Sequence, residues 1–430
     1  MSIKILATAD LHLGRMSTAV PEHAEERSSR YTWEGIVEWA VQHHVDLLLL
    51  AGDIIDEDNR FFEAIGPLQS GFRTLKNNGV QVCMIAGNHD HDVLAQVIRD
   101  EQYDHIHMLG TNGEWEVTTF SHSDGAEIQI AGWSFPGKYV RQDPLGGFDD
   151  LTLDSDRVIL GLLHADVGVV GSKYAPVSLH HLAGKPVDAW ILGHIHSPGK
   201  LQSAHPYIAY TGTPHALNPG EPGLHGPILL EINGKEDIRI SRVPLSPVRY
   251  ENVEVDVSEA EDAESFRHVV SARLLSEAQA LLSQLEKVAF LICDVKLTGE
   301  NRFVDQINGW KDQVLNYTTS LETNTRVLVR KIDNRVQPAV MNLQELATHD
   351  SPAGKLAETI LAIQDGESTP FLDELTGQWQ WNLTKINQSA TYLPLMKEGR
   401  LAEPSDEKAR EYILNECNRL LGALLSQQKK

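Results

Sequence analysis

The chain has 430 residues, which predicts two or three domains of roughly 150 residues each. Its 41% of hydrophobic residues exclude an intrinsically disordered protein. The 60 acidic residues outnumber the 37 basic ones, and the resulting net charge of −23 argues against a protein that binds nucleic acid by charge attraction alone.

The cysteines and the apolar segments exclude further classes of protein. Three isolated cysteines, Cys83, Cys293 and Cys417, form neither a disulfide framework nor a cysteine-type zinc site. The opening MSIKILATAD reaches a charged residue too early for a signal peptide, and the apolar runs are shorter than the ~20 residues that span a bilayer. We therefore expect a soluble, cytoplasmic protein with no membrane partner.

The first part of the chain alternates between strand and helix patterns. Residues 3–9, 45–51 and 80–86 are apolar runs typical of buried strands. Helical periodicity is expected near 31–44 and over about 60–77. This alternation predicts a layered α/β domain.

The following segment is richer in strands. Strands are expected at 114–120, 127–133, 157–164, 189–192, 207–210 and 228–232. They predict a second sheet packed on the first, so the fold class is an α/β sandwich of two sheets flanked by helices.

Prolines indicate where this domain ends. Pro244 and Pro247 break the chain after a first domain predicted at 1–243. A strand, helix, strand, helix, strand pattern then predicts a small α/β domain at 249–337, and residues 338–430 are expected to be mostly helical.

Polar motifs follow the predicted strands of the first domain. In chain order they are Asp10-x-His12, Gly52-Asp53-x-x-Asp56, Gly87-Asn88-His89-Asp90, His164 and Gly193-His194-x-His196. Each motif alone is weak, but open α/β sheets place their ligand sites at the carboxyl ends of strands. We therefore expect these side chains to converge on one site.

The residue types in these motifs indicate a metal centre. The expected ligands are Asp10, His12, Asp53, Asn88, His164, His194 and His196. Oxygen and imidazole donors without thiolate favour Mn, Fe or Zn, and seven ligands exceed the need of one tetrahedral zinc ion. They suit two divalent ions that share one carboxylate. His89 is a candidate catalytic acid, with Asp90 fixing its tautomer.

The ordered set DLH, GDIID, GNHD, GLLHAD and GHIH resembles the calcineurin-like metallophosphoesterases. Within that superfamily it is similar to the SbcD-type nucleases of DNA double-strand-break repair, including the YhaO-like subgroup. The resemblance covers about residues 1–235 well. The predicted domain at 249–337 resembles, less specifically, the DNA-binding capping domain of that family.

The resemblance implies roles for the individual ligands. The first metal would be held by Asp10, His12, Asp53 and His196, and the second by Asp53, Asn88, His164 and His194. Asp53 would bridge the two ions, most often Mn²⁺, and His89 would act as acid or stabilise the transition state. A hydroxide between the ions would attack phosphorus in line, so that the protein cleaves DNA as an exonuclease or endonuclease.

The resemblance also implies partners. Relatives act with an SMC-like ABC ATPase (SbcC or a YhaN-like protein) that docks on C-terminal helices, and homodimers are usual among them. Here Ile413, Cys417, Leu420 and Leu424 form an apolar stripe on the predicted last helix, which suits either partner docking or internal packing. Because the chain is acidic, we expect its grip on DNA to depend on bound metal and on a partner.

Two other functions remain open from the sequence. A small-molecule phosphoesterase, for example one acting on cyclic nucleotides, would use the same metal site. A non-catalytic subunit that positions the ATPase would keep the fold alone. The roles of His91 and His215, which lie in or near these motifs, also remain open.

Overall fold

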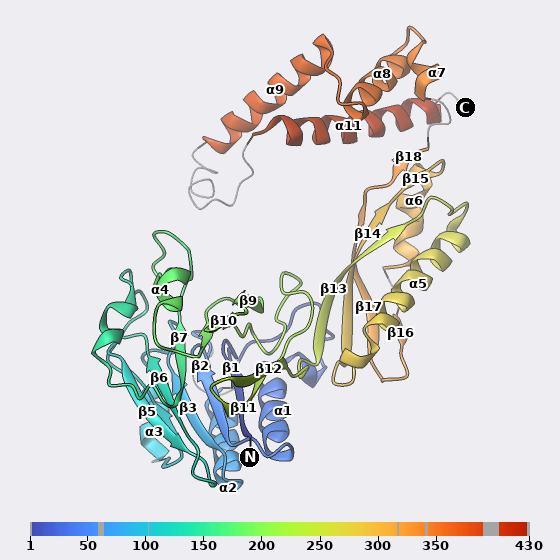
Figure 1. The fold of residues 1–430 in the computed structure, drawn as a ribbon. Coiled ribbons are helices and arrows are strands. Elements are labelled where there is room, and N and C mark those ends of the chain that lie inside the picture. The colour runs from blue at the N-terminus through green and yellow to red at the C-terminus, as the bar shows by residue number, and fades with distance from the viewer. Residues whose placement is uncertain are drawn as a thin grey trace. The chain divides into compact units, whose positions relative to one another are not determined.

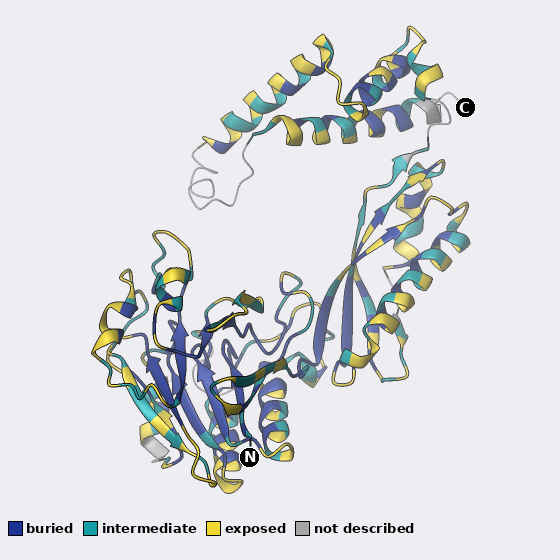
Figure 2. Cartoon of the chain, in the orientation of Figure 1, coloured by how far each residue is buried: buried dark blue, intermediate teal, exposed yellow. Residues whose placement is uncertain are grey.

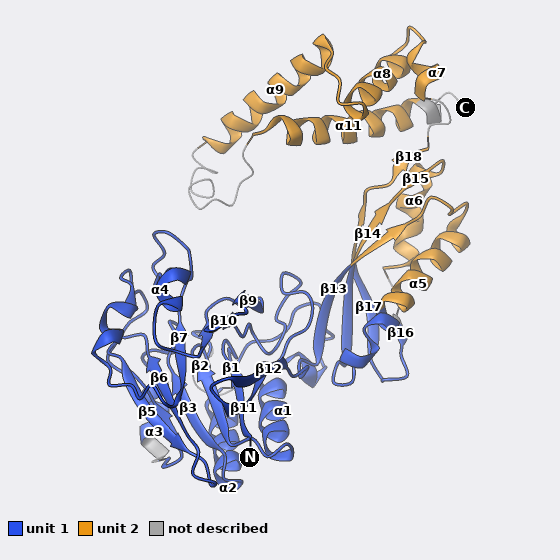
Figure 3. Ribbon diagram, in the orientation of Figure 1, with its two compact units in different colours: residues 1–252, 278–294, 318–330 blue, residues 253–277, 295–317, 331–430 orange. Residues whose placement is uncertain are grey.

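The computed structural model describes residues 2–58, 64–101, 103–315, 318–339, 343–389 and 404–427. The chain divides into two compact units, which Figure 3 shows in different colours. Unit 1 comprises residues 1–252, 278–294 and 318–330, and unit 2 comprises residues 253–277, 295–317 and 331–430. The three-domain division expected at 243 and 338 stays a prediction, and part of its last domain lies outside the described residues.

The first sheet of unit 1 has six strands in the order β12-β11-β1-β2-β3-β4. Their bounds are Ile3–Thr8 (β1), Leu47–Ala51 (β2), Gln81–Ile85 (β3), Ile106–Met108 (β4), Ile228–Gly234 (β11) and Asp237–Arg242 (β12). Strands β1 to β4 are parallel, so their carboxyl ends share one edge. The expectation that residues 228–232 belong to the second sheet is wrong, because β11 pairs antiparallel with β1.

The second sheet also has six strands, in the order β5-β6-β7-β8-β10-β9. Their bounds are Glu116–Ser121 (β5), Glu127–Trp133 (β6), Val158–His164 (β7), Ala189–Gly193 (β8), Gly199–Gln202 (β9) and Tyr207–Tyr210 (β10). Strands β6, β7, β8 and β10 are parallel. The α/β sandwich expected from the sequence is thereby confirmed.

The two sheets pack face to face through alternate side chains. Ile5 and Leu49 of the first sheet share a buried cluster with Ile130 and Leu160 of the second. Figure 2 shows these strands in dark blue, as buried. This packing aligns the ends of both sheets along one edge, which is where the motif residues follow the strands.

Helices cover the outer faces of the sandwich. Their bounds are Ser29–Gln42 (α1), Ile65–Asn77 (α2), Leu94–Glu101 (α3) and Leu179–Ala183 (α4). On α1, Trp33 and Ile36 are fully buried against the first sheet, as the helical periodicity predicts. The helix expected over 60–77 starts at Ile65, and residues 59–63 lie outside the described part of the chain.

The small α/β region contains a four-stranded sheet in the order β13-β14-β17-β16. Its elements are Val248–Asp256 (β13), Ala263–Ala280 (α5), Phe290–Thr298 (β14), Val304–Trp310 (α6), Thr318–Ser320 (β16) and Arg326–Asn334 (β17). Two short strands, Glu300–Asn301 (β15) and Gln337–Pro338 (β18), form a separate pair. Within unit 1, Tyr250 and Phe290 pack with Val20 and Ala216, which fixes the start of this sheet beside the loops of the sandwich.

The last part of unit 2 is helical, as expected (Figure 1). Its helices are Leu343–Ala347 (α7), Pro352–Gln364 (α8), Pro370–Asn387 (α9) and Asp406–Gln427 (α11). On α11, Ile413 and Cys417 are buried in a cluster with the other helices, whereas Leu420 is 43% exposed. Most of the apolar stripe therefore packs internally. Among the described residues, no helix is long and apolar enough to cross a membrane.

Candidate metal centre

The motif residues meet at the carboxyl ends of five parallel strands. Asp10 and His12 follow β1, Asp53 follows β2, Asn88 and His89 follow β3, His164 ends β7, and His194 and His196 follow β8. The structure therefore brings together the side chains that the sequence singled out, from both sheets. Their roles as metal ligands stay predictions.

The backbone at this edge is strained. Asp10, His12 and Asp53 have φ values of 53°, 43° and 51°, in the left-handed region that residues with a side chain rarely adopt. At Gly52, whose φ is 88°, a Cβ atom would lie 2.7 Å from His164 Nδ1 and 2.8 Å from the backbone N of Gly87. Such outliers persist only where the surrounding structure enforces them, and they occur often at functional sites.

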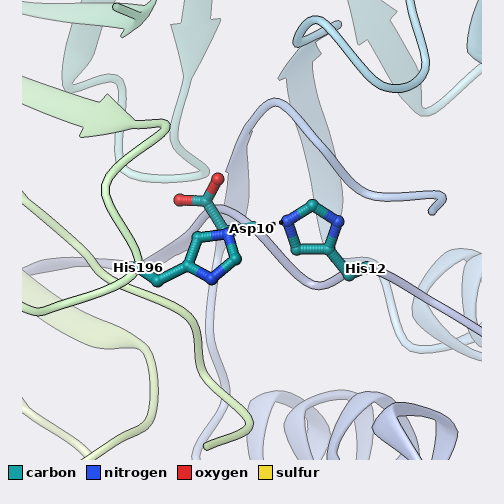
Figure 4. Close-up of side chains that lie close together, drawn as sticks. All are labelled: Asp10, His12 and His196. Carbon is teal, nitrogen blue, oxygen red and sulfur yellow. Dashed lines mark hydrogen bonds between the residues drawn. The ribbon is translucent and has the colours of Figure 1, made fainter. Parts of the chain in front are cut away.

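The first cluster consists of Asp10, His12 and His196, whose ligand atoms all lie within 4.8 Å of one another. Figure 4 shows the two imidazole rings turned toward each other beside the Asp10 carboxylate. The distance between His12 Nε2 and His196 Nε2 is only 3.0 Å.

A carboxylate lies behind each of these rings. Nδ1 of His196 donates a hydrogen bond to Glu221 Oε1 at 2.9 Å. Nδ1 of His12 lies 3.2 Å from Asp56 Oδ1, at ion-pair distance. Both contacts favour the tautomer with the proton on Nδ1, so the Nε2 lone pairs of the two rings face each other. Either a proton shared in a hydrogen bond or a metal ion bound by both rings satisfies this pair of nitrogens, and with the Asp10 carboxylate beside them the first cluster fits a divalent metal ion.

The second cluster consists of Asp53, Asn88 and His164. Nδ1 of His164 donates to the backbone oxygen of Ala51 at 3.0 Å, which leaves Nε2 to hold either a proton or a metal ion. That Nε2 lies 3.3 Å from Asp53 Oδ2 and 3.3 Å from Asn88 Oδ1. A proton or a metal ion at this point is stabilised by both oxygens, so the second cluster also fits a cation.

Electrostatics favour positive charge at the second cluster. Burial lowers the pKa of His164, but the charge and hydrogen bond of Asp53 outweigh it and raise the pKa to about 9. Burial likewise raises the pKa of Asp53, yet His164 and His12 hold it well below its usual value. Asp10 is close enough to join Asp53 and His164 as well as the first cluster, so the two clusters adjoin.

His194 lies beside the second cluster, with its ring centroid 5.2 Å from that of His164. Its backbone N donates to both carboxylate oxygens of Asp10 at 3.1 Å. Its Nε2 lies 3.2 Å from Asp166 Oδ1, which leaves Nδ1 as the nitrogen for a metal. A third side chain is thus oriented by a carboxylate.

His89 stands at the rim, with 31% of its side chain exposed. Its Nε2 lies 3.9 Å from Asp53 Oδ2, and its backbone N donates to Asp53 Oδ1 at 2.8 Å. Burial and the neighbouring His12 lower the pKa of His89 against the opposing charge of Asp53. This position suits a proton donor that reaches a substrate from the solvent side.

The Asp90 carboxylate accepts hydrogen bonds from the backbone N of Ile54 at 2.6 Å, Ile55 at 3.3 Å and Gly87 at 2.8 Å. The expected contact between Asp90 and His89 stays a prediction. Burial and the charge of Asp53 raise the pKa of Asp90 to about 6. Asp90 therefore connects the loop after β2 to the loop after β3. These backbone N–H groups are buried and cannot bond to water, so they need an acceptor within the protein, which the carboxylate supplies. Asp90 thereby positions the ligand loops.

Three acidic residues and two histidines complete the surroundings. Asp56, Asp166 and Glu221 were not expected to have a role, although all three are buried and lie against expected ligands. Asp166 follows His164 by two residues and Asp56 follows Asp53 by three, so short spacing was their one signal. His215 is completely buried, and its ring contacts Ser17 and Thr32, so it has a structural role. His91 contacts the backbone oxygen of Asn88 through Nδ1 at 3.2 Å.

Comparison with known proteins agrees with this centre. Residues 3–198 match the family model of the calcineurin-like phosphoesterases. The chain is 29% identical over 272 residues to the "Uncharacterized metallophosphoesterase YhaO" of Bacillus subtilis (strain 168). That match covers 60% of this chain and 64% of the relative, so it spans less than two thirds of the relative's length.

Two phosphoesterases are among the solved structures that match part of the chain. A dimetal phosphatase from Danio rerio is 12% identical, with a TM-score of 0.34, and the match covers 56% of this chain and 99% of that one. The calcineurin-like phosphoesterase YfkN from Bacillus subtilis is 14% identical, with a TM-score of 0.32 and coverage of 65% and 99%. All seven expected ligands lie within residues 3–198, the range that matches the family model of the calcineurin-like phosphoesterases.

Proposed function

We propose that the protein is a dinuclear metal-dependent phosphodiesterase that cleaves DNA. The observation that carries this proposal is the pair of adjoining acceptor clusters, above all the 3.0 Å between the Nε2 atoms of His12 and His196. Nitrogen and oxygen donors of this kind suit Mn²⁺, and Fe or Zn are the other candidates. Asp53 would bridge the ions.

The metal ions and the side chains of the chain would have separate roles in hydrolysis. Two bound divalent ions would supply Lewis acidity to the phosphoryl group and lower the pKa of the attacking water. Water oxygen bonds to phosphorus and releases a proton to the solvent, while the bond from phosphorus to the leaving oxygen breaks. His89, exposed at the rim, would give that leaving oxygen its proton.

Cations around the site favour a polyanionic substrate. Arg15 is 40% exposed and lies 3.9 Å from Asp56, and the side chain of Lys138 is 42% exposed. Lys173 and Arg141 lie in the loops that follow β7 and β6. A region of about 190 residues beyond Pro244 is more than a small-substrate enzyme needs, and it also favours DNA.

We further propose that the protein works in DNA repair in the cytoplasm with an SMC-like ABC ATPase. The net charge of −23 supports a partner, because this chain by itself repels a long duplex. The helical part of unit 2 offers exposed apolar side chains, Trp381, Ile386 and Leu420, to such a partner. A homodimer stays a prediction.

The decisive experiment measures hydrolysis by the purified protein with Mn²⁺ on linear DNA and on cyclic nucleotides. We expect cleavage of DNA, its loss with EDTA, and a decrease of about 10²- to 10⁴-fold in His89→Ala. The matched control is His181→Ala, a surface histidine on α4 whose removal leaves the rate unchanged.

Two results would contradict the proposal in different ways. Cleavage of cyclic nucleotides without cleavage of DNA would indicate a small-molecule phosphoesterase. Two bound Mn²⁺ ions without hydrolysis of either substrate would indicate the non-catalytic subunit.

A further inference from the structure

A row of aromatic rings leads from the buried end of the metal centre to the surface of unit 1. The ring centroids of His164 and His194 are 5.2 Å apart, those of His194 and Tyr174 are 4.9 Å apart, and those of Tyr174 and Tyr139 are 5.9 Å apart. His164 is fully buried, whereas Tyr139 is 50% exposed. The last ring of the row therefore offers a face to a ligand next to the metal centre.

The two loops that carry these tyrosines hold each other in place. Backbone N of Val140 donates to the backbone oxygen of Lys173 at 2.9 Å, and that of Ala175 donates to Val140 at 2.8 Å. Ser172 hydrogen-bonds to Asp166, the same carboxylate that contacts His194. The position of Tyr139 is thus connected to the position of an expected ligand.

A lysine with an unneutralised charge lies over the exposed ring. Lys173 Nζ is 4.4 Å from the centroid of Tyr139 and 5.3 Å from that of Tyr174. It forms no salt bridge with any described residue. Its neighbour Lys138, by contrast, is paired with Glu57 at 2.5 Å. Lys173 is therefore available to an anion, and Tyr139 to a planar group beside that anion.

We propose that Tyr139 and Lys173 bind an unpaired nucleotide next to the scissile phosphodiester, and this proposal rests on the proposed function. The base stacks on Tyr139, and Lys173 contacts the adjoining phosphate. Every base has a π-face, so such stacking tolerates any sequence and contributes about 1–3 kcal/mol per base. In a duplex both faces of a base are already covered, so the platform favours single strands and frayed ends.

The experiment uses single-stranded oligonucleotides with one abasic residue placed on either side of a chosen bond. Cleavage at that bond with Mn²⁺ is compared with the intact strand. For the wild-type protein, we expect the abasic residue on one side to lower kcat/KM by about 5- to 150-fold, the equivalent of one stacked base. In Tyr139→Leu, kcat/KM for the intact strand should fall, and the ratio of kcat/KM for the intact strand to that for the abasic strand should fall to near 1. Tyr139→Trp should restore this ratio.

The matched control is Tyr412→Leu, because Tyr412 on α11 is 51% exposed and lies outside unit 1. It should keep the wild-type ratio. A second measurement concerns Lys173→Gln, in which the slope of log affinity for the strand against log salt should become less steep by about 0.7, the loss of one phosphate contact.

Each outcome separates the two proposals. Equal cleavage of intact and abasic strands by the wild-type protein overturns the stacking platform while DNA cleavage stands. A ratio that stays high in Tyr139→Leu, or an unchanged salt slope in Lys173→Gln, overturns it as well. If the wild-type protein cleaves no DNA at all, the proposed function fails and the platform fails with it.

Discussion

The two clusters of the metal centre differ in what lies behind their histidines. In the first cluster, His12 and His196 are backed by the carboxylates of Asp56 and Glu221. In the second cluster, His164 is backed by the backbone oxygen of Ala51, whereas His194 beside it is backed by a carboxylate, that of Asp166. A backbone carbonyl is positioned by the strand itself, whereas a carboxylate side chain adds a negative charge that makes the imidazole a stronger ligand.

Burial distinguishes His196 from the other two rings, since the side chain of His12 is only 1% exposed. The side chain of His196 is 30% exposed, whereas that of His164 is 0% exposed. The fold of the sandwich thus determines the geometry of the second cluster. The carboxylate charges behind His12 and His196 would determine how strongly the first cluster binds a metal ion. Three substitutions test this distinction.

The largest effect is expected for Asp53→Asn. The carboxylate lies at the second cluster and, as the proposed bridge, would serve both ions. Its loss should lower phosphodiesterase kcat/KM by at least about 10³-fold, because a neutral amide stabilises neither ion well. The measurement combines hydrolysis rates with the metal content of the purified variant. Two bound ions and a rate within tenfold of wild type would show that Asp53 is no bridge.

A smaller effect is expected for Glu221→Gln, which keeps an acceptor near His196 but removes the charge. The pKa of Glu221 is lowered, since its contacts with His196 and Leu217 outweigh its burial. We expect Mn²⁺ to bind the first cluster about 10- to 100-fold more weakly in calorimetric titration, while the second cluster keeps its affinity.

The control for Glu221→Gln is Asp143→Asn, which removes a carboxylate from the surface histidine His181, 2.7 Å away. Metal binding should be unchanged in this variant. An equal loss of affinity at both clusters in Glu221→Gln would break the comparison, because it would show that the charge is not specific to the first.

The smallest effect is expected on the pH dependence of the free energy of unfolding, and it concerns the loop that carries Glu221. His215 belongs to this loop, and burial lowers its pKa to about 4. As pH falls below 6.5, the unfolded state takes up a proton that the folded state does not, so the stability present above pH 6.5 is lost toward pH 4. This histidine alone should lower the free energy of unfolding by about 2 kcal/mol between pH 7 and pH 5.

Urea unfolding of the wild type and His215→Gln at both pH values measures this difference. The variant should be less stable at pH 7 but should lose about 2 kcal/mol less on acidification. His107→Gln, at an exposed position on β4, serves as control and should lose as much as wild type. Equal acid sensitivity of wild type and His215→Gln would rule out His215 as the source.

Much of the site was predictable from the sequence because its signals are local. Asp10, Asp53 and Asn88 each come directly after an apolar run, and parallel strands bring their carboxyl ends to one edge. The same logic predicted most strands of the two sheets and the buried face of α1, but not β4, β9 or β12. These features depend on residues only a few positions apart, and periodicity and motif spacing report on that range.

What stayed hidden depends on contacts between distant parts of the chain. Glu221 lies 25 residues from His196, and no spacing connects Asp90 with the backbone of Ile54, 36 residues earlier. The partner of β11 and the row of rings from His164 to Tyr139 likewise arise only when the loops of two sheets meet.

The sequence by itself determined the α/β class, the ligand types and the edge at which they gather, since strand patterns and motifs are short-range properties. Only the tertiary structure decided which carboxylate stands behind which histidine, which Asp holds loops together, and where an exposed tyrosine adjoins the centre. Those features depend on burial and on the direction of side chains, which residues acquire only when distant segments pack.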